Sequence, residues 1–145
     1  MYSITGRLNA WSPTMLSVLR VVVGLVFLAH GAQKILGLPA SPMNPAMFSL
    51  PWIAGMLELV GGTMIVLGLF TRPVAFILSG EMAFAYWMAH APRGAFPALN
   101  GGDAAILFCF VFLYFVFSGP GRFSLDALMN RRARDVGEFR TTQTV

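Results

Sequence analysis

Side chains that can move protons or donate hydrogen bonds lie inside two otherwise apolar stretches of the chain. His30, Gln33 and Lys34 fall within the run VLRVVVGLVFLAHGAQKIL, and Glu58 lies in the middle of a second apolar run. Histidine, glutamine and lysine can donate hydrogen bonds, and a glutamate can accept or relay a proton. Several ionisable groups at a similar depth are more than helix packing requires, and ionisable residues inside a membrane usually mark a functional site. The pattern therefore predicts a functional site that contains His30, Gln33, Lys34 and Glu58.

Phe27 and Asp103 are further candidates for this site. Phe27 precedes His30 by three residues, which places both side chains near one face of a helix. Asp103 is expected near the same membrane surface as Lys34. It also has a structural alternative, because after Asn100-Gly-Gly it could supply negative charge to the first turn of a helix capped by Asn100.

Two charge pairs are expected from the depth of each group in the membrane. At a rise of about 1.5 Å per residue, Arg20 and Glu81 each lie roughly 10 Å from one surface, and His30 and Glu58 lie roughly 10 Å below the other. We therefore predict a structural pair of Arg20 with Glu81 and a second pair of His30 with Glu58. Charged groups inside a membrane cost about 3 kcal/mol each on insertion scales and usually mark a functional site. Mutual neutralisation that only locks the helices together is the alternative for both pairs.

Composition indicates that these residues belong to one membrane domain. Of 145 residues, 57% are hydrophobic and only 11% are charged, whereas soluble domains carry about 25% charged residues. We predict an all-α bundle of four transmembrane helices with up-down topology over residues 14–121. Apolar segments separated by Pro- and Gly-rich breaks place its helices at about 14–36, 51–70, 73–90 and 103–118. A polar lead over residues 1–13 precedes the bundle, and a tail over residues 122–145 follows it.

Small residues mark the faces by which the first two helices should pack. On the first helix, one arc combines glycines with the polar groups, and it contains Arg20, Gly24, Phe27, Gly31 and Lys34. On the second helix, four glycines lie on the same side as Glu58, namely Gly55, Gly61, Gly62 and Gly68. Small side chains allow membrane helices to approach closely. The glycine face of the second helix is therefore expected to pack against another helix, and the polar face of the first helix must be received by the rest of the chain.

The distribution of cations predicts the orientation of the bundle. With four spans, one side of the membrane holds seven arginines, at positions 7, 72, 122, 131, 132, 134 and 140, and the other side holds Lys34 and Arg93. The positive-inside rule then places both termini in the cytoplasm. The tail is expected to form a basic amphipathic helix on anionic lipid headgroups, with Phe123, Leu128 and Met129 toward lipid, and to be disordered after Asp135.

Several other classes of function find no support in the sequence. The single cysteine, Cys109, allows neither an internal disulfide nor a Cys-x-x-Cys redox pair. We predict no bound metal, flavin or haem, because no metal-ligand spacing or cofactor motif is present and His30 and His90 lack the well-defined pairing of haem-binding spans. Half of the cationic residues follow the last apolar segment, so the net charge of +4 does not indicate a nucleic-acid partner.

Four stretches of the chain together resemble the DoxX family of small four-helix membrane proteins. They are Arg20 with GLVFLAHGAQK, then GMLELVGGTMIVLGLFTRP over residues 55–73, FPALNGGDAAILF over 96–108 and GPGRFSLD over 119–126. They occur in the family order, and the family usually has glutamate where Asp103 stands. The resemblance implies a multi-pass protein of the bacterial plasma (inner) membrane, in a family often labelled as oxidoreductases. Similar proteins are tied to quinone-linked oxidation of thiosulfate and to membrane complexes that deal with thiol and oxidative stress.

The resemblance, taken with the polar groups, favours a subunit of a quinone-linked oxidoreductase with its polar site in the outer half of the bundle. Quinone carbonyls accept hydrogen bonds, and oxidation of a quinol needs a proton acceptor. We therefore expect catalytic roles for Glu58 and His30, and binding of the quinone by Gln33, Lys34, Phe27 and Asp103. Because the chain carries no redox cofactor motif, electrons would have to come from a partner subunit or a soluble substrate. Two other functions remain open. The chain could be a non-enzymatic membrane anchor or accessory subunit that recruits a catalytic partner, or it could form a pathway for protons or a small solute. A partner protein subunit or a homo-oligomer is compatible with each of these hypotheses.

Overall fold

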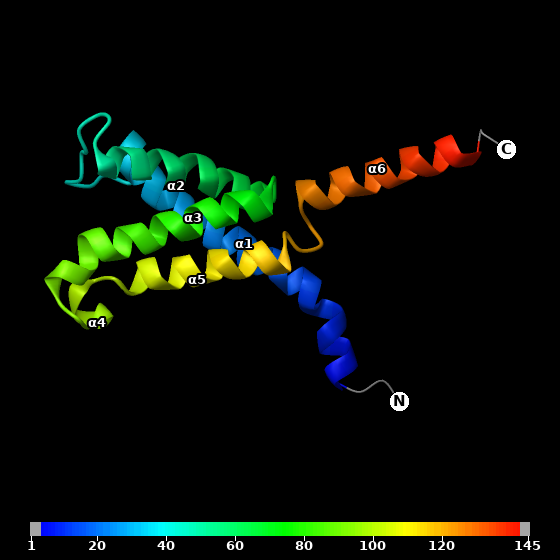
Figure 1. Cartoon of the computed structure of the whole chain (residues 1–145), viewed down its shortest axis with the longest axis horizontal. Helices are drawn as coiled ribbons and strands as arrows, with labels where there is room; N and C mark the ends of the chain where they lie inside the picture. The colour runs from blue at the N-terminus through cyan, green and yellow to red at the C-terminus, as the bar shows by residue number, and fades with distance from the viewer. Residues whose placement is uncertain (1–3, 143–145) are drawn as a thin grey trace.

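The protein is helical throughout the part that its structure describes, which is the backbone of residues 4–142 and the side chains of residues 4–133. The computed structural model contains no strand within that range. Its long helices are α1 (Ile4–Leu36), α2 (Leu50–Leu67), α3 (Thr71–Ala85), α5 (Asp103–Ser118) and α6 (Leu125–Thr142) (Figure 1). The helical path of α3 continues through a π-helical turn at Tyr86–His90 and a 3-10 turn at Ala91–Arg93, and α4 (Pro97–Asn100) follows.

Helices α1 and α2 form an antiparallel pair whose backbones approach closely through glycines. A Cβ atom on Gly62 would lie 2.9 Å from the Cα of Leu28, and one on Gly24 would lie 2.8 Å from the side chain of Val66. The buried residues of α1 follow the predicted arc and include Arg20, and those of α2 follow the predicted glycine face around Glu58. The close approach of small residues is typical of membrane helix pairs.

Helices α3 and α5 form the other half of the bundle. The Ser79 hydroxyl on α3 donates a hydrogen bond of 2.9 Å to the Cys109 carbonyl on α5. Phe27 of α1 packs edge-on against the rings of Phe108 and Phe112 of α5, with ring centroids 5.1 and 4.8 Å away. The core therefore joins side chains of all four bundle helices, and its buried apolar members are Phe27, Ile65, Ala75, Leu78, Met82, Ala105, Phe112 and Phe115.

Arg20 is fully buried and binds backbone carbonyl oxygens at one end of the bundle. Its Nε donates to Pro120 O at 2.8 Å, one terminal nitrogen donates to Phe123 O at 2.5 Å, and the other donates to Val66 O at 2.6 Å. That second terminal nitrogen also contacts Ile65 O. The last carbonyls of a helix have no partner within it, and a guanidinium presents five donors in a planar fork. Arg20 thus ties the end of α2 to the α5–α6 linker.

The predicted pairing of Arg20 with Glu81 is wrong. The donors of Arg20 are taken by carbonyl oxygens, and the carboxylate whose charge acts on Arg20 is Asp126. Asp126 caps α3, because its two carboxylate oxygens accept hydrogen bonds from the backbone N–H groups of Phe70 and Thr71 at 2.8 and 2.9 Å. Its own N–H donates to Gly68 O at 2.9 Å. The start of α6 is thereby fixed to the α2–α3 turn.

The ends of the chain differ from the sequence prediction. The structure has helix from Ile4, where the sequence predicts a polar lead up to residue 13, and Pro13 lies inside α1. Helix α6 continues past Asp135 to Thr142, whereas the sequence predicts disorder after Asp135. Apart from Gly137, the stretch from Asp135 to Thr142 contains no residue that strongly disfavours a helix. Figure 1 shows the first turns of α1 and all of α6 extending beyond the bundle. Residues 1–3 and 143–145, and the side chains of Arg134 and Arg140, lie outside the described part.

Two described helices, Ile4–Leu36 and Leu50–Leu67, are long and apolar enough to cross a membrane by length and composition. Asp103–Ser118 is apolar but shorter. The α1–α2 pair therefore supplies the strongest candidate spans, and the residues of the candidate site lie chiefly on this pair.

Candidate functional site

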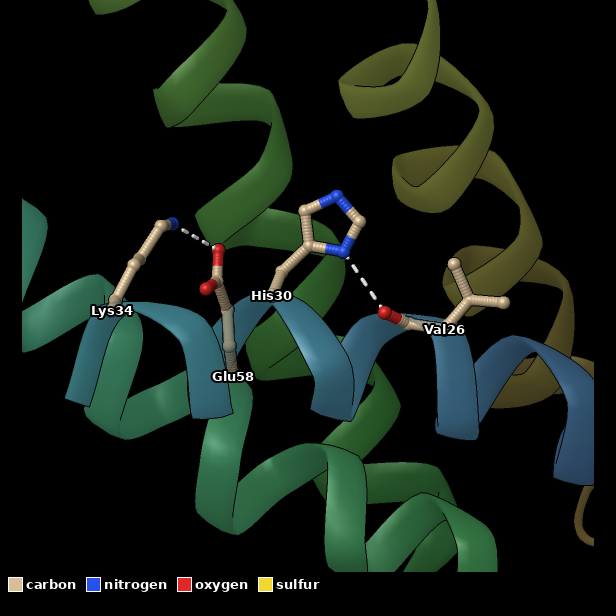
Figure 2. Close-up of polar contacts among 4 residues, drawn as sticks. All are labelled: Val26, His30, Lys34 and Glu58. Atoms are coloured by element: carbon tan, nitrogen blue, oxygen red, sulfur yellow. Dashed lines mark hydrogen bonds and ion pairs between the residues drawn. The ribbon is translucent and has the colours of Figure 1, made fainter. Parts of the chain in front are cut away.

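An ion pair between α1 and α2 lies at the centre of the site. Lys34 Nζ lies 2.6 Å from Glu58 Oε1, and the side chains point toward each other in Figure 2. The Glu58 side chain is only 4% exposed, while that of Lys34 is 18% exposed. A buried carboxylate needs a partner because desolvation is costly, and a charge-assisted hydrogen bond of this length is a strong one. Glu58 is therefore held by Lys34, and the predicted direct pairing of Glu58 with His30 does not form.

Glycines on both helices allow Lys34 to reach Glu58. A Cβ atom on Gly55 would lie 2.8 Å from the Cβ of Lys34. Gly31, three residues before Lys34, meets the α2 backbone at Glu58 and Leu59 at a distance that leaves no room for a Cβ. The stem of the lysine thus passes over the bare backbone at Gly55. The same small residues that let the helices pack also set the geometry of the ion pair.

His30 lies beside the ion pair but turns away from it. Its Nδ1 lies 2.8 Å from Val26 O, and Figure 2 shows the ring directed back along α1 toward Val26. Because a carbonyl oxygen can only accept, this bond places a hydrogen on Nδ1 and leaves Nε2 of the neutral ring as an acceptor. The ring edge packs on Phe108 with centroids 5.9 Å apart. His30 is exposed and is close enough to Glu58 for its charge to act on that carboxylate.

An apolar groove runs between α1 and α5 and ends at His30. Its volume is about 350 Å³. The described residues that line it are aliphatic or aromatic apart from His30, and they are Val22, Val23, Val26, His30, Ala104, Leu107, Phe108 and Val111. Most small-molecule sites combine such apolar walls with a few polar groups that fix orientation. The groove can accept a flat apolar ring or chain, and His30 is the one described lining residue whose side chain can form hydrogen bonds.

Glu81 of α3 also belongs to this polar region. The sequence instead predicts Glu81 near the other membrane surface, beside Arg20. Both carboxylate oxygens of Glu81 are buried and lack a hydrogen-bond partner among the described residues, as does Oε2 of Glu58. The charges of Glu58 and Lys34 both act on Glu81. Three helices therefore contribute one ammonium and two carboxyl groups to a single cluster, which we call the charge cluster and define as Lys34, Glu58 and Glu81.

The other predicted binding residues have different surroundings. Phe27 is buried in the core against Phe108 and Phe112, and it does not line the groove. Asp103 is exposed at the first residue of α5, next to Ala104 in the groove wall. Gln33 is half-buried on α1, beside Lys34 in sequence. The structure thus brings Lys34 and Glu58 together with His30 nearby, while Phe27 serves packing.

Comparison with known proteins shows relatives along most of the chain. A Haemophilus influenzae protein described as uncharacterized is 46% identical in an alignment of 126 positions, and the alignment covers 83% of this chain and 94% of the relative. An uncharacterized membrane protein of Mycobacterium tuberculosis is 32% identical in an alignment of 159 positions, and the alignment covers 90% of each chain. The inner membrane protein YphA of Escherichia coli is 28% identical in an alignment of 131 positions, and the alignment covers 81% of this chain and 92% of YphA. No solved structure matches this chain.

The family model described as DoxX matches residues 15–91. The matched segment contains His30 and all three members of the charge cluster, and it covers more than half of the chain. Two of the relatives are described as membrane proteins, which agrees with the two helices that are long and apolar enough to cross a bilayer. The chain is therefore a membrane protein of the DoxX family.

Proposed function

We propose that this protein binds a quinone in the groove between α1 and α5 and serves as a subunit of a quinone-linked oxidoreductase. One observation carries the proposal: the groove is apolar along its length and ends at a single imidazole, His30, beside the Lys34–Glu58 ion pair. A quinone has the matching form, with an apolar ring and tail and polar carbonyls at one end.

The residues of the site can handle the protons of the reaction. Reduction of a quinone to a quinol takes up two electrons and two protons. A partner subunit that oxidises the substrate would supply the electrons, since this chain has neither a dithiol nor a cofactor motif. His30 in its protonated form can donate from Nε2 to a quinone carbonyl, and in its neutral form it can accept from a quinol hydroxyl. Lys34 and Glu58 lie next to His30 and can exchange protons with it or with water at the membrane surface.

The proposed placement is a multi-pass protein of the bacterial inner membrane with both termini in the cytoplasm. Helix α1 has 33 residues, or about 50 Å at 1.5 Å per residue, and exceeds the roughly 30 Å hydrocarbon core. Helix α5 has 16 residues, or about 24 Å, so we expect the bilayer to thin beside it. Arg72 and Arg122 would then face the cytoplasm, with the α1–α5 groove and His30 toward the outer leaflet.

Binding of a short-chain ubiquinone analogue to the purified protein in nanodiscs tests the proposal. The His30→Ala variant should bind the analogue at least about tenfold more weakly, which corresponds to losing about 1.4 kcal/mol. His90→Ala is the matched control, because His90 lies outside the groove, with Nδ1 at 3.2 Å from Asn100 O. If the wild-type protein does not bind the analogue, or if both variants bind it equally, the proposal is wrong.

A second candidate function is that of an anchor or accessory subunit, and the position of α6 favours it. Helix α6 extends beyond the bundle (Figure 1), and its start is fixed by Asp126. Exposed Leu128 and Met129 precede exposed Arg131 and Arg132 on it, a combination suited to anionic lipid headgroups or to an acidic partner protein. Purification of the full-length chain and of a chain without residues 129–145 from native membranes would distinguish a partner protein from anionic lipid. A stoichiometric partner that is lost on truncation supports the accessory function, whereas retention on anionic vesicles alone indicates lipid.

A further inference from the structure

The charge cluster has more acidic groups than the surrounding helices can neutralise. Glu58 Oε1 receives Lys34 at 2.6 Å, but Glu58 Oε2 and both oxygens of Glu81 are buried without a hydrogen-bond partner among the described residues. Glu58 is 3% exposed as a whole residue. With both carboxyls ionised, the cluster would carry a net negative charge between membrane helices, where an uncompensated charge is unfavourable.

No other described group is placed to neutralise Glu81. Arg20, the buried cation among the described residues of the bundle, is occupied by carbonyl oxygens at Pro120 and Phe123. His30 of α1 makes its hydrogen bond to Val26 O and acts on Glu58. Helix α5, which packs against α3, contributes no cation, because its titratable residues are Asp103, Cys109 and Tyr114. Glu58 and Lys34 are the groups whose charges act on Glu81, and Lys34 is already paired.

We propose that the charge cluster is a proton-binding site and that Glu81 carries the proton as a neutral carboxylic acid. Lys34 decides which carboxyl is protonated, because its ammonium stabilises the ionised form of the carboxylate it contacts, which is Glu58. The proton is dissociable: transfer within the cluster breaks the O–H bond on Glu81 and forms one on Glu58 Oε2. No electron moves in this step. The inference is independent of quinone binding, since the proton is held whether or not the groove is occupied.

Infrared spectroscopy of the full-length protein tests this assignment directly. A protonated carboxyl has a C=O stretch that an ionised carboxylate lacks, and the band shifts in D₂O because the hydrogen exchanges. The measurement is made at neutral pH in a maltoside detergent, which has no carbonyl group of its own. We expect the wild-type protein to show a band equivalent to one carboxyl group, and Glu81→Gln to lose all of it.

Two further variants separate a proton site from a merely structural role. Lys34→Met removes the cation that keeps Glu58 ionised, so the band should double to the equivalent of two carboxyl groups. Asp103→Asn is the control, because Asp103 is exposed and its removal should leave the band unchanged. A wild-type spectrum without the band, or a band unaffected by Glu81→Gln, would overturn the proposal. If Glu81→Gln does not fold, two other results test the proposal: the doubling of the band in Lys34→Met and the loss of the wild-type band at high pH. Absence of both changes overturns the proposal.

Discussion

The ammonium of Lys34 on α1 reaches the carboxylate of Glu58 on α2 at 2.6 Å because the α2 backbone beneath the lysine stem is a glycine, Gly55. Packing and chemistry therefore depend on the same contact. A side chain at position 55 would meet both Lys34 and Ile35, and a displaced lysine would leave Glu58 buried without its partner.

The first prediction concerns this contact. Gly55→Ala should destabilise the protein by about 1–3 kcal/mol through overpacking, and the cause is the Cβ position 2.8 Å from Lys34 Cβ. Gly80→Ala is the matched control on α3, because a Cβ there meets nothing within 4 Å; it should stabilise by roughly 0.5–1 kcal/mol. Thermal unfolding in detergent measures both. Equal shifts for the two variants would contradict the role of Gly55.

The second prediction concerns the separation of Arg20 from Glu81. Arg20→Met should destabilise the bundle by about 1–3 kcal/mol or more, since it leaves buried carbonyl oxygens without a donor. Arg20→Lys should not rescue the loss, because an ammonium cannot reproduce the planar fork. Arg122→Met is the control at an exposed arginine, where the change should be within about 0.5 kcal/mol.

A double-mutant cycle tests the same separation in another way. The effects of Arg20→Met and Glu81→Gln on the free energy of unfolding should add within about 0.5 kcal/mol, as for sites without shared partners. A larger coupling would mean that the two side chains interact after all.

The third prediction concerns the cap that Asp126 places on α3. Asp126→Ala removes both acceptors from the N–H groups of Phe70 and Thr71 and should cost about 1 kcal/mol, the usual effect of losing a helix cap. It should also free the start of α6, so that protease cleavage in the linker of residues 119–124 becomes faster. Asp103→Asn should leave the cleavage rate unchanged, and a similar rate in Asp126→Ala would show that the cap does not hold the linker.

The fourth prediction concerns the volume of the groove. Ala104→Trp places a large ring in the groove wall and should weaken binding of the quinone analogue at least about tenfold, or about 1.4 kcal/mol. Val18→Trp adds the same ring at an exposed position of α1 outside the lining and should leave the affinity unchanged. Equal binding by the two variants would place the quinone elsewhere.

The helix faces could be predicted from the sequence because they follow from periodicity within one helix. Gly24 and Gly31 recur at helical spacing with Arg20, and the structure buries this arc. The glycines around Glu58 likewise indicated the packing face of α2. The DoxX motifs led to the same family that the comparison identifies.

The partners of the charged residues could not be predicted because they depend on register between helices. His30 and Lys34 are one turn apart on α1, and a depth estimate from uncertain helix ends is no finer than that turn of about 5.4 Å. The depth estimate therefore favours His30 as the partner of Glu58, whereas the structure pairs Glu58 with Lys34. The carbonyls that hold Arg20 become available only where α2 ends and the α5–α6 linker returns, and no sequence pattern marks that meeting point.

Photolabelling of the membrane-embedded protein with an azidoquinone tests whether the groove between α1 and α5 holds a quinone with its polar end at His30. We expect the label to attach within residues 22–30 of α1 and 104–111 of α5, and an excess of unlabelled quinone to prevent this labelling. Label spread evenly over the lipid-facing helices without competition, or concentrated on α2 and α3, would show that the groove does not hold the quinone.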